Sequence, residues 1–370
     1  MALLEYAVFH PWRALTVLMV GTLLGLGSFY AYQVSAALGA VAVEEFDPDI
    51  ARSAIETGGG APTTTAFSIA GVYVEPAYDV GEELELIAAT LASIPESRPF
   101  NLAASGEPID DGVFDAYLLV GSDASGRLAD AIILTLQPTD GGKPIMVSLP
   151  RDLYVWNLCK RSFTRLNSGL GGCSGVASGS ELLAIMVQDY TGIPIDHLAR
   201  INFDGFARVV DAMGGITVCV DYPTRDPKSH LLIEVPGCQT AGGETALAWV
   251  RSRQPEQLIG EEWQPAGGSD FTRQRNQQDV LFQLAGRAAG FSSPASLAAK
   301  LEAVAASVRL DSSWSLGQAV STAWRYRGIS KDSVKRFSIS VREYRTSYGA
   351  AVLLPAKPFK EHLSAVYDLG

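Results

Sequence analysis

The sequence predicts an α/β domain that begins near residue 111 and follows an N-terminal membrane-spanning helix. Two observations support this prediction. From Asp115 onward, short apolar runs alternate with segments of helical periodicity, which is typical of α/β domains. The 30 residues from Ala14 to Val43 carry no charge, and roughly 20 such residues suffice to cross a bilayer as a helix. At 370 residues, 47% of them hydrophobic, the chain is long enough for one large core or two ordinary ones.

The charges on either side of the uncharged segment predict its orientation. Arg13 and the α-amino group precede it, whereas four acidic residues follow it between positions 44 and 49. The positive-inside rule therefore places residues 1–13 in the cytoplasm and everything after the span at 14–43 outside it. Two alternatives remain: a cleaved signal peptide, for which residues 36–40 supply small side chains, and a buried core helix.

Residues 44–110 are predicted to form an extracytoplasmic stalk. The segment Gly58-Gly-Gly-Ala-Pro-Thr-Thr-Thr65 is turn-rich and polar, and one helical stretch follows at residues 82–93. The composition changes near residue 111, so the α/β domain is expected to occupy residues 111–370.

Three short apolar runs predict the first strands of this domain, at residues 115–120, 131–136 and 145–149. Pro138-Thr-Asp-Gly-Gly142 is a tight-turn sequence, so the second and third strands should form a hairpin. Pro150 ends the third strand.

Helices and strands alternate after the hairpin. Ser178 and Glu181 have the spacing of a capping box, and Gly192 is placed to stop the helix predicted at residues 178–190. The other predicted elements are a strand at 198–203, a helix at 204–213 capped by Asp204 and stopped by Gly214, a strand at 216–220, helices at 243–249 and 273–289, and a strand at 334–341.

The four cysteines agree with an exported domain. Cys159 and Cys173 flank one Gly/Ser-rich loop, and Cys219 and Cys238 flank another loop, which favours two local disulfides in an oxidising compartment. Four cysteines permit three pairings in all. A zinc site is less favoured because the sequence has no CxxC motif and its four histidines are not clustered with the cysteines.

The formal net charge of −11 and the pI near 4.9 argue against general affinity for nucleic acid, which would require a basic surface. Any anion that the protein binds must therefore meet a local basic cluster.

One such cluster is expected at the edge of the predicted hairpin. Asp123 follows the first strand, Asp130 precedes the second and Arg151 follows the third, so the three side chains should emerge together. Two carboxylates beside an arginine suit a divalent cation that bridges to phosphate oxygens, because hard cations prefer oxygen and the guanidinium fork matches phosphate. Arg127 lies in the same loop.

A second basic cluster lies downstream. Arg251 and Arg253 are two residues apart, so on an extended segment they would point to the same face and bind a multivalent anion. Arg273 lies at the start of a predicted helix, where free amide groups favour anions, and Gln277 follows one turn later on the same face. Taken singly, each arginine is more often part of a surface ion pair.

The remaining polar residues are assigned no chemistry. Asp211 and Asp226 are interpreted as structural or as supporting the site, and His197 and His230 are too isolated to be proposed as bases. The sequence contains neither a nucleophile elbow nor a phosphate-cradling P-loop.

Eight motifs between residues 112 and 290 resemble, in order, the LytR-CpsA-Psr family. They are Gly121-Ser-Asp123 with Ala129-Asp130, Val147-Ser-Leu-Pro-Arg-Asp152, Arg165-Leu-Asn167, Thr191-Gly-Ile-Pro-Ile-Asp-His197, Asn202-Phe-Asp-Gly-Phe206, Asp211-Ala-Met-Gly-Gly215, Ala246-Leu-Ala-Trp-Val-Arg-Ser-Arg253 and Asp270-Phe-Thr-Arg273. The resemblance implies a three-layer α/β/α sandwich with a central mixed sheet. The cysteine pairs are similar to those of actinobacterial members.

The resemblance also implies a phosphotransferase that moves a glycopolymer from a polyprenyl-pyrophosphate carrier onto peptidoglycan through a phosphodiester bond. It implies a Mg²⁺ or Mn²⁺ ion held by Asp123 and Asp130, which would act in catalysis together with Arg151. The residues that match the family's pyrophosphate contacts are Arg127, Arg151, Arg251, Arg253, Arg273 and Gln277. The expected partners are the lipid-linked glycopolymer, peptidoglycan and the membrane, without nucleic acid.

Two alternative functions fit the same residues. One is a polyprenyl-pyrophosphate pyrophosphatase, which would use water as the acceptor. The other is a non-catalytic regulator of envelope assembly that binds the lipid carrier.

Overall fold

A seven-stranded mixed sheet forms the centre of the molecule. The computed structural model describes residues 41–57, 108–289, 294–314, 318, 322 and 331–369. The strands, in spatial order, are β1 (Ala42–Glu44), β14 (Val308–Asp311), β7 (His197–Asn202), β2 (Phe114–Ser122), β3 (Ala129–Pro138), β4 (Ile145–Ser148) and β15 (Lys335–Ser338). Three neighbouring pairs are parallel, β1 with β14, β2 with β7 and β4 with β15, and the other three are antiparallel.

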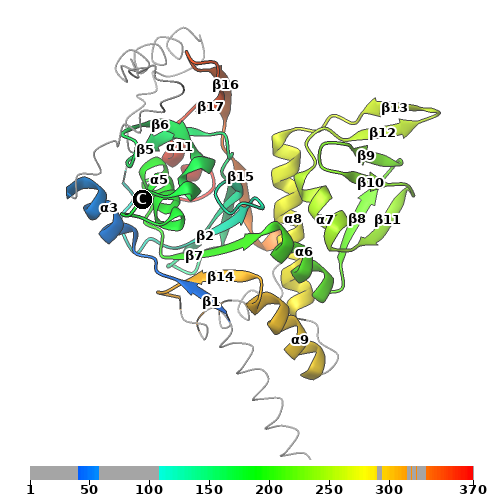
Figure 1. Cartoon of the computed structure of the whole chain (residues 1–370), viewed down its shortest axis with the longest axis horizontal. Helices are drawn as coiled ribbons and strands as arrows, with labels where there is room; N and C mark the ends of the chain where they lie inside the picture. Colours follow the sequence, from blue (N-terminus) through cyan, green and yellow to red (C-terminus); the bar gives the residue numbers. More distant parts are fainter. Residues whose placement is uncertain are drawn as a thin grey trace, which may run out of the picture.

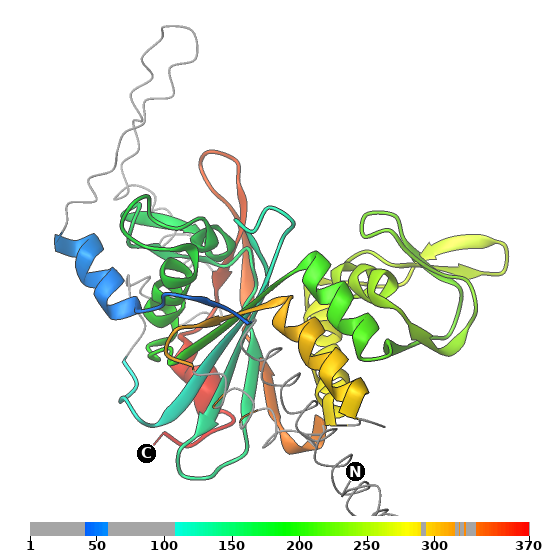
Figure 2. The same cartoon turned by 60° about the horizontal axis from the view of Figure 1, so that its bottom comes forward.

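Helices lie on both sides of this sheet, so the domain has three layers (Figures 1 and 2). One side carries α3 (Pro48–Thr57), the 3-10 helix η1 (Leu166–Gly171), α5 (Gly179–Thr191) and α11 (Phe359–Ser364). The other side carries α6 (Phe203–Ala212), α7 (Gly243–Arg251), α8 (Asp270–Ala289) and α9 (Pro294–Ala305).

The largest core lies between the sheet and α5. Leu118, Leu134 and Val147 project from the strands into the same buried cluster as Leu183 and Ile185 of α5. Each buried side chain of this size contributes roughly 1.5–3 kcal/mol relative to an exposed one. The ends of α5 are fixed locally by the Ser178–Glu181 capping box and by Gly192 in the left-handed conformation.

A smaller core fixes α8 on the opposite face of the sheet. Phe282 of α8 packs with Ile133, Met146 and Val334. Gln278, one turn earlier, donates from Nε2 to Ser148 Oγ at 3.0 Å. These contacts hold the first turns of α8 beside the end of β4, where the candidate site is found.

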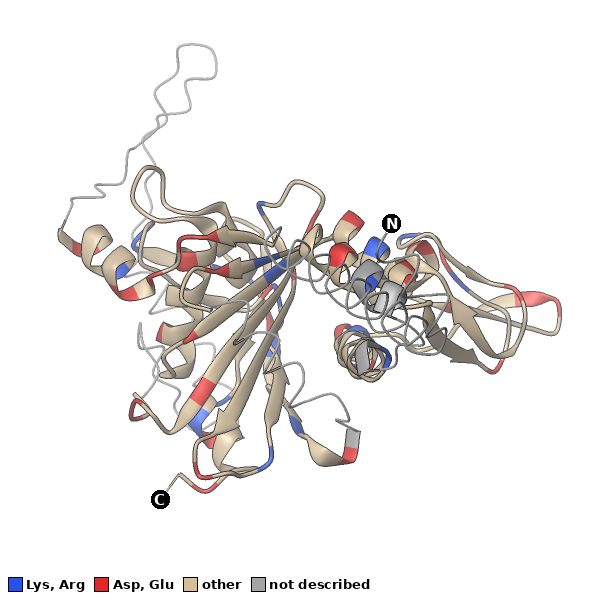
Figure 3. Cartoon of the chain, turned by 90° about the horizontal axis from the view of Figure 1, so that it is seen from below, with Lys and Arg blue, Asp and Glu red and all other residues tan. Residues whose placement is uncertain are grey.

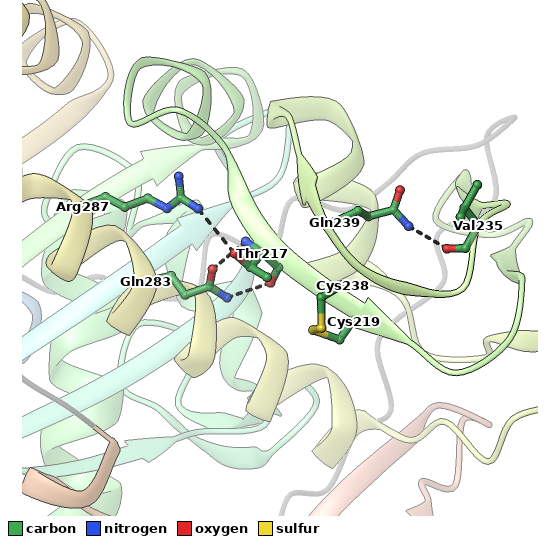
Figure 4. The surroundings of a disulfide bond; sticks show 7 residues. All are labelled: Thr217, Cys219, Val235, Cys238, Gln239, Gln283 and Arg287. Carbon is green, nitrogen blue, oxygen red and sulfur yellow. Dashed lines mark hydrogen bonds between the residues drawn. A yellow bond between two sulfur atoms is a disulfide. The ribbon is translucent and has the colours of Figure 1, made fainter.

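Two small sheets lie beyond α7 and α8 (Figure 1). The first pairs β8 (Ile216–Val220) with β11 (Gly237–Ala241), and the second contains β10 (Leu231–Ile233), β9 (Thr224–Asp226), β12 (Glu256–Ile259) and β13 (Glu262–Pro265). A disulfide joins Cys219 to Cys238 across β8 and β11 (Figure 4). Gln283 of α8 exchanges two hydrogen bonds with the backbone of Thr217, which attaches this sheet to the helix.

Two β-hairpins complete the domain. They are β5 (Tyr154–Asn157) with β6 (Ser162–Arg165), and β16 (Val341–Arg345) with β17 (Ala351–Pro355). The second disulfide, Cys159–Cys173, joins the loop after β5 to the segment before α5.

The structure confirms the main predictions for the domain. The sheet is mixed and the fold is α/β, residues 131–136 and 145–149 form neighbouring antiparallel strands, and the α5 capping box is present. Both local disulfides are formed, and no free cysteine remains among the described residues.

Several predicted boundaries were wrong, including the start of α8, which was predicted at residue 273 and lies at Asp270. The side chain that caps α6 is Asn202, which accepts from Gly205 N at 2.8 Å, and not Asp204. The helix predicted at 243–249 continues through Arg251. The strand predicted at 334–341 is divided into β15 and the start of β16, because the chain leaves the central sheet after Ser338.

The N-terminal limit of the domain also differs from the prediction. Part of the predicted stalk belongs to the domain: β1 joins the sheet beside β14, and Ile55 of α3 is buried in the main core. Ala42 and Val43, the last residues of the predicted span, form β1 instead. The rest of that span and the helix predicted at 82–93 lie outside the described residues. Within the described part of the chain, no helix is long and apolar enough to cross a membrane.

Candidate active site

A pocket of about 1000 Å³ lies where the end of β4, the end of α7, the start of α8 and the β16–β17 hairpin meet. Acidic positions are spread over the described chain (Figure 3), in agreement with the net charge of −11. The pocket gathers six basic and five acidic side chains. Its charged lining residues are Arg151, Lys228, Arg251, Arg253, Arg273, Arg345, Asp130, Asp152, Asp226, Asp270 and Glu343.

Asp130 reaches the pocket through an irregularity in the sheet. Gly121 of β2 pairs with Ala131 and Ser122 pairs with Ala129, so Asp130 has no partner residue on β2. This is the pattern of a β-bulge, which bends a strand and redirects the extra side chain. The bulge turns the Asp130 carboxylate toward Arg151, and the two side chains form an ion pair.

Arg151 follows β4 and lies between two carboxylates. Besides the pair with Asp130, its Nε lies 3.5 Å from Asp152 Oδ2. Burial alone lowers the pKa of an arginine, but here Asp130 and Asp152 outweigh burial and raise the pKa of Arg151. Arg151 is therefore a fixed cation at the floor of the pocket.

The start of α8 supplies a second fixed cation. The Arg273 side chain is only 5% exposed and forms an ion pair at 2.8 Å with Asp270, one turn earlier. Burial lowers the pKa of Arg273, and the neighbouring Arg151 and Arg253 lower it further, although Asp270 opposes this change. Gln274 donates to the other oxygen of Asp270 at 2.9 Å, so the Asp270 carboxylate is held in place.

Arg251 and Arg253 enter the pocket from the end of α7. Arg251 lies over the ring of Phe203, with 4.5 Å from Cζ to the ring centroid, and Arg253 Nε lies 3.3 Å from Asp270 Oδ1. Arg251 is the last residue of the helix, so the extended geometry predicted for this pair was wrong, yet both side chains line the same pocket.

Asp226 fixes the backbone that carries Arg253. Its Oδ2 accepts from Ser252 Oγ at 2.8 Å and from the backbone N–H groups of Arg253 and Gln254 at 2.9 and 3.0 Å. Burial raises the pKa of Asp226, but these hydrogen bonds outweigh burial and lower the pKa below its ordinary value.

Two guanidinium nitrogens in this pocket have unused donor capacity. Arg151 Nε and Arg273 Nε are shielded from solvent and donate no hydrogen bond to any described residue. Buried donors are nearly always satisfied in folded proteins, so such groups require an explanation. Both arginines line the pocket, and an anion with several oxygens, such as a phosphate group, matches guanidinium groups.

The loop between β2 and β3 lies apart from this arrangement. Asp123 accepts from Ser125 Oγ at 2.8 Å and from the backbone N–H groups of Arg127 and Leu128 at 3.2 Å. Although burial raises the pKa of Asp123, these hydrogen bonds lower it overall. Neither Asp123 nor Arg127 is among the residues that line the pocket.

A metal site made by protein ligands alone is not formed here. Within the described residues, no three His, Cys, Asp or Glu side chains gather closely enough to hold a cation. Mg²⁺, however, is often held by one or two carboxylates together with waters and substrate phosphates. Asp130 fits a shared site of this kind, whereas Asp123 would first have to release the hydrogen bonds within its loop.

The structure thus brings together six of the residues predicted for the site, Asp130, Arg151, Arg251, Arg253, Arg273 and Gln277. Sequence reasoning gave no role to the residues that support or extend them, which include Asp152, Lys228, Gln254, Gln274 and the β16–β17 hairpin. Asp152 was detectable, since it ends the motif that contains Arg151. No sequence feature near the β16–β17 hairpin indicates that it lines the pocket.

Comparison with known proteins places the chain in a family. The model of the LytR_cpsA_psr family matches residues 98–364. The chain belongs to this family. It is 35% identical over 154 residues to "Probable cell wall biosynthesis protein LcpB" of Corynebacterium glutamicum, a match that covers 37% of this chain and 36% of LcpB.

This member of the LytR_cpsA_psr family is also 28% identical over 231 residues to "Polyisoprenyl-teichoic acid--peptidoglycan teichoic acid transferase TagU" of Halalkalibacterium halodurans. The match covers 59% of this chain and 66% of TagU. The matches thus span less than two thirds of the length of these relatives. Among solved structures, the LytR-Csp2A-Psr enzyme from Actinomyces oris shares the fold with a TM-score of 0.56 and 24% identity, over 70% of this chain and 96% of that one.

Proposed function

We propose that this protein transfers a glycopolymer from a polyprenyl-pyrophosphate carrier to a hydroxyl group of peptidoglycan and forms a phosphodiester bond. The observation that supports this proposal most directly is the arginine pocket. Arg151, Arg253 and Arg273 come from three separate segments, and all three line the pocket. A pyrophosphate offers negative oxygens to several arginines at once. The transferase name of the relative TagU supports the same reaction class.

The reaction requires charge stabilisation more than covalent catalysis. The acceptor hydroxyl attacks the phosphorus nearer the sugar, and the polyprenyl phosphate leaves. Negative charge on the transferred and leaving oxygens is stabilised by fixed cations, and Arg151 and Arg273 are held in place by Asp130 and Asp270 before the substrate arrives.

We further propose that Mg²⁺, or Mn²⁺ in its place, assists this reaction. Asp130 would hold the ion together with substrate oxygens and water, and the ion would neutralise charge on the pyrophosphate. Asp130 and Arg151 lie side by side in the pocket, so both groups would then meet the same phosphate.

The proposed setting is the outer face of the cell membrane, where lipid-linked donors and peptidoglycan meet. The uncharged segment at residues 14–43 would anchor the chain with its N-terminus in the cytoplasm. Two disulfides in the folded domain support an oxidising compartment.

The test is a transfer assay with the full-length chain in detergent, a synthetic polyprenyl-pyrophosphate oligosaccharide, peptidoglycan fragments and Mg²⁺, followed by mass spectrometry. Wild-type protein should yield the phosphodiester-linked product. Arg151→Ala should lower the transfer rate about 10²- to 10³-fold, the usual effect of removing one oxyanion-stabilising donor. Arg309→Ala, an exposed arginine on β14 outside the pocket, serves as the matched control.

The products distinguish the alternatives. Hydrolysed donor without linked product would favour a pyrophosphatase. Donor that binds and stays intact would favour a regulator. An Arg151→Ala protein that transfers at the wild-type rate would remove Arg151 from the site.

A further inference from the structure

One face of the β16–β17 hairpin forms a wall of the pocket. Val341, Glu343 and Arg345 alternate along β16, and all three line the pocket. Leu353 of β17 is the cross-strand partner of Glu343 and lines the pocket too. Residues directly opposite each other in an antiparallel pair project from the same face. The side chain of Glu343 therefore faces the pocket.

The opposite face of the hairpin anchors it to the domain. Tyr344, Val352 and Leu354 pack in an aromatic and aliphatic cluster with Tyr154 and Phe163 of the β5–β6 hairpin, although Tyr344 and Val352 also border the pocket. This alternation explains the direction of Glu343, because turning it away from the pocket would bury a carboxylate in an apolar cluster.

The backbone fixes how far Glu343 lies from Arg151. Leu353 N donates to Asp152 O at 2.9 Å, and Leu353 forms a β-bridge with Leu153. The Arg151–Leu153 segment, β17 and β16 therefore lie side by side. Two strand spacings separate Glu343 from this segment, about 10 Å at the backbone. Both side chains line the same pocket, so a group bound there can lie near both.

Glu343 also differs from the other carboxylates of the pocket in its contacts. Asp130 pairs with Arg151, Asp270 with Arg253 and Arg273, and Asp152 lies 3.5 Å from both Arg151 and Arg165. Asp226 accepts four hydrogen bonds through its side chain.

In contrast, the exposed side chain of Glu343 makes no hydrogen bond or ion pair with any described residue. A carboxylate that already accepts from cations or N–H groups has little capacity to take a proton, whereas a free one retains it. No histidine lines the pocket among the described residues, and Lys228 Nζ donates to Gln254 at 2.8 Å.

We propose that Glu343 is the general base of the transfer and that the β16–β17 wall receives the acceptor glycan. This proposal rests on the proposed function and adds the residue that activates the acceptor. The hydroxyl oxygen forms a bond to the sugar-proximal phosphorus, and its proton passes to the Glu343 carboxylate. The bond from that phosphorus to the bridging oxygen breaks, and the polyprenyl phosphate leaves with both electrons. Glu343 then returns the proton to solvent.

The experiment compares full-length wild type with Glu343→Gln, which keeps the size of the side chain and removes the base. The expected result is a fall in kcat for transfer of about 100-fold or more, the usual contribution of general base catalysis. The Kd for the polyprenyl-pyrophosphate donor should stay unchanged, since the arginines that bind it are intact. The acid limb of the pH–rate profile should disappear.

Two further variants separate chemistry from structure. Glu262→Gln, an exposed carboxylate on β13 outside the pocket, should transfer as wild type does. Glu343→Ala should be slow and partly rescued by formate, a small carboxylate that a merely structural role would not respond to.

Glu343→Gln with wild-type kcat and an unchanged acid limb would overturn the proposal while leaving the transferase function intact. A wild-type protein that binds donor but forms no linked product would overturn the transferase function and the role of Glu343 with it.

Discussion

The first turn of α8 and the loop between β2 and β3 both concentrate charged side chains, but they use them differently. In the loop, the described donors to the Asp123 carboxylate all lie within five positions of it. At α8, Asp270 contacts Arg273 on its own helix and Arg253 from the segment after α7. The hydrogen bonds of Asp123 stay within its loop, whereas Asp270 connects two segments. Arg273 Nε has no acceptor among the described residues.

This difference shows where binding capacity is located. A carboxylate whose oxygens accept hydrogen bonds from its own turn stabilises that turn. Its oxygens then have little hydrogen-bonding capacity left for a ligand. A carboxylate that aligns arginines from separate segments fixes their positions without using all five donors of each guanidinium. The α8 region therefore presents arginines to the pocket, and the loop does not.

Among the substitutions that test this difference between α8 and the loop, Asp270→Asn should lower the transfer rate most. Loss of the charge weakens the contacts with both Arg253 and Arg273, and charge-assisted hydrogen bonds contribute about 1.5–3 kcal/mol. The transfer rate should fall about 10- to 100-fold. Steady-state transfer assays measure this change, with thermal unfolding to confirm that the protein remains folded.

Asp204→Asn, an exposed aspartate on α6, is the matched control for Asp270→Asn. Equal transfer rates for the two variants would contradict the role of Asp270 in aligning the arginines.

A smaller and pH-dependent effect is expected at Asp226, which holds the Arg253 backbone. Its pKa is lowered in the folded protein, so its contribution to stability is present above the unfolded pKa of about 3.9 and is lost as pH falls through the folded value. Asp226→Asn should therefore lower the free energy of unfolding at pH 7. The difference from wild type should shrink below about pH 4.

Urea denaturation at pH 7, 5 and 3 measures the Asp226 effect. A difference between wild type and variant that stays constant over this range would show that the charge of Asp226 does not stabilise the fold.

The sequence predicted contacts that follow from local rules and missed those that depend on distant segments. The tight turn at residues 138–142 was sufficient to place Asp130 near Arg151, because hairpin strands are neighbours. The hydrogen bond from Leu353 to Asp152 joins segments far apart in the chain, so nothing near either residue indicates that Glu343 lines the pocket. At Asp123, spacing predicted a shared metal site, but Ser125 and the local backbone compete for its oxygens.

The smallest expected effect is that of Asp123→Asn. The amide oxygen of asparagine accepts hydrogen bonds from Ser125 and the loop backbone as the carboxylate does, and surface substitutions of this kind change stability by about 0.5 kcal/mol or less. Transfer should stay within about twofold of wild type. EDTA should stop transfer by both proteins, and the Mg²⁺ concentration that restores half of the activity should be the same for both.

Asp130→Asn is the matched comparison, because its carboxylate lies in the pocket and pairs with Arg151. This variant should need a higher Mg²⁺ concentration for half-maximal transfer, since it replaces the carboxylate proposed to hold the ion. If Asp123→Asn instead raises the Mg²⁺ requirement as much as Asp130→Asn does, the loop must open when substrate binds. Asp123 would then exchange its hydrogen bonds with Ser125 and the loop backbone for the cation, and the contrast between loop and helix would hold only without substrate.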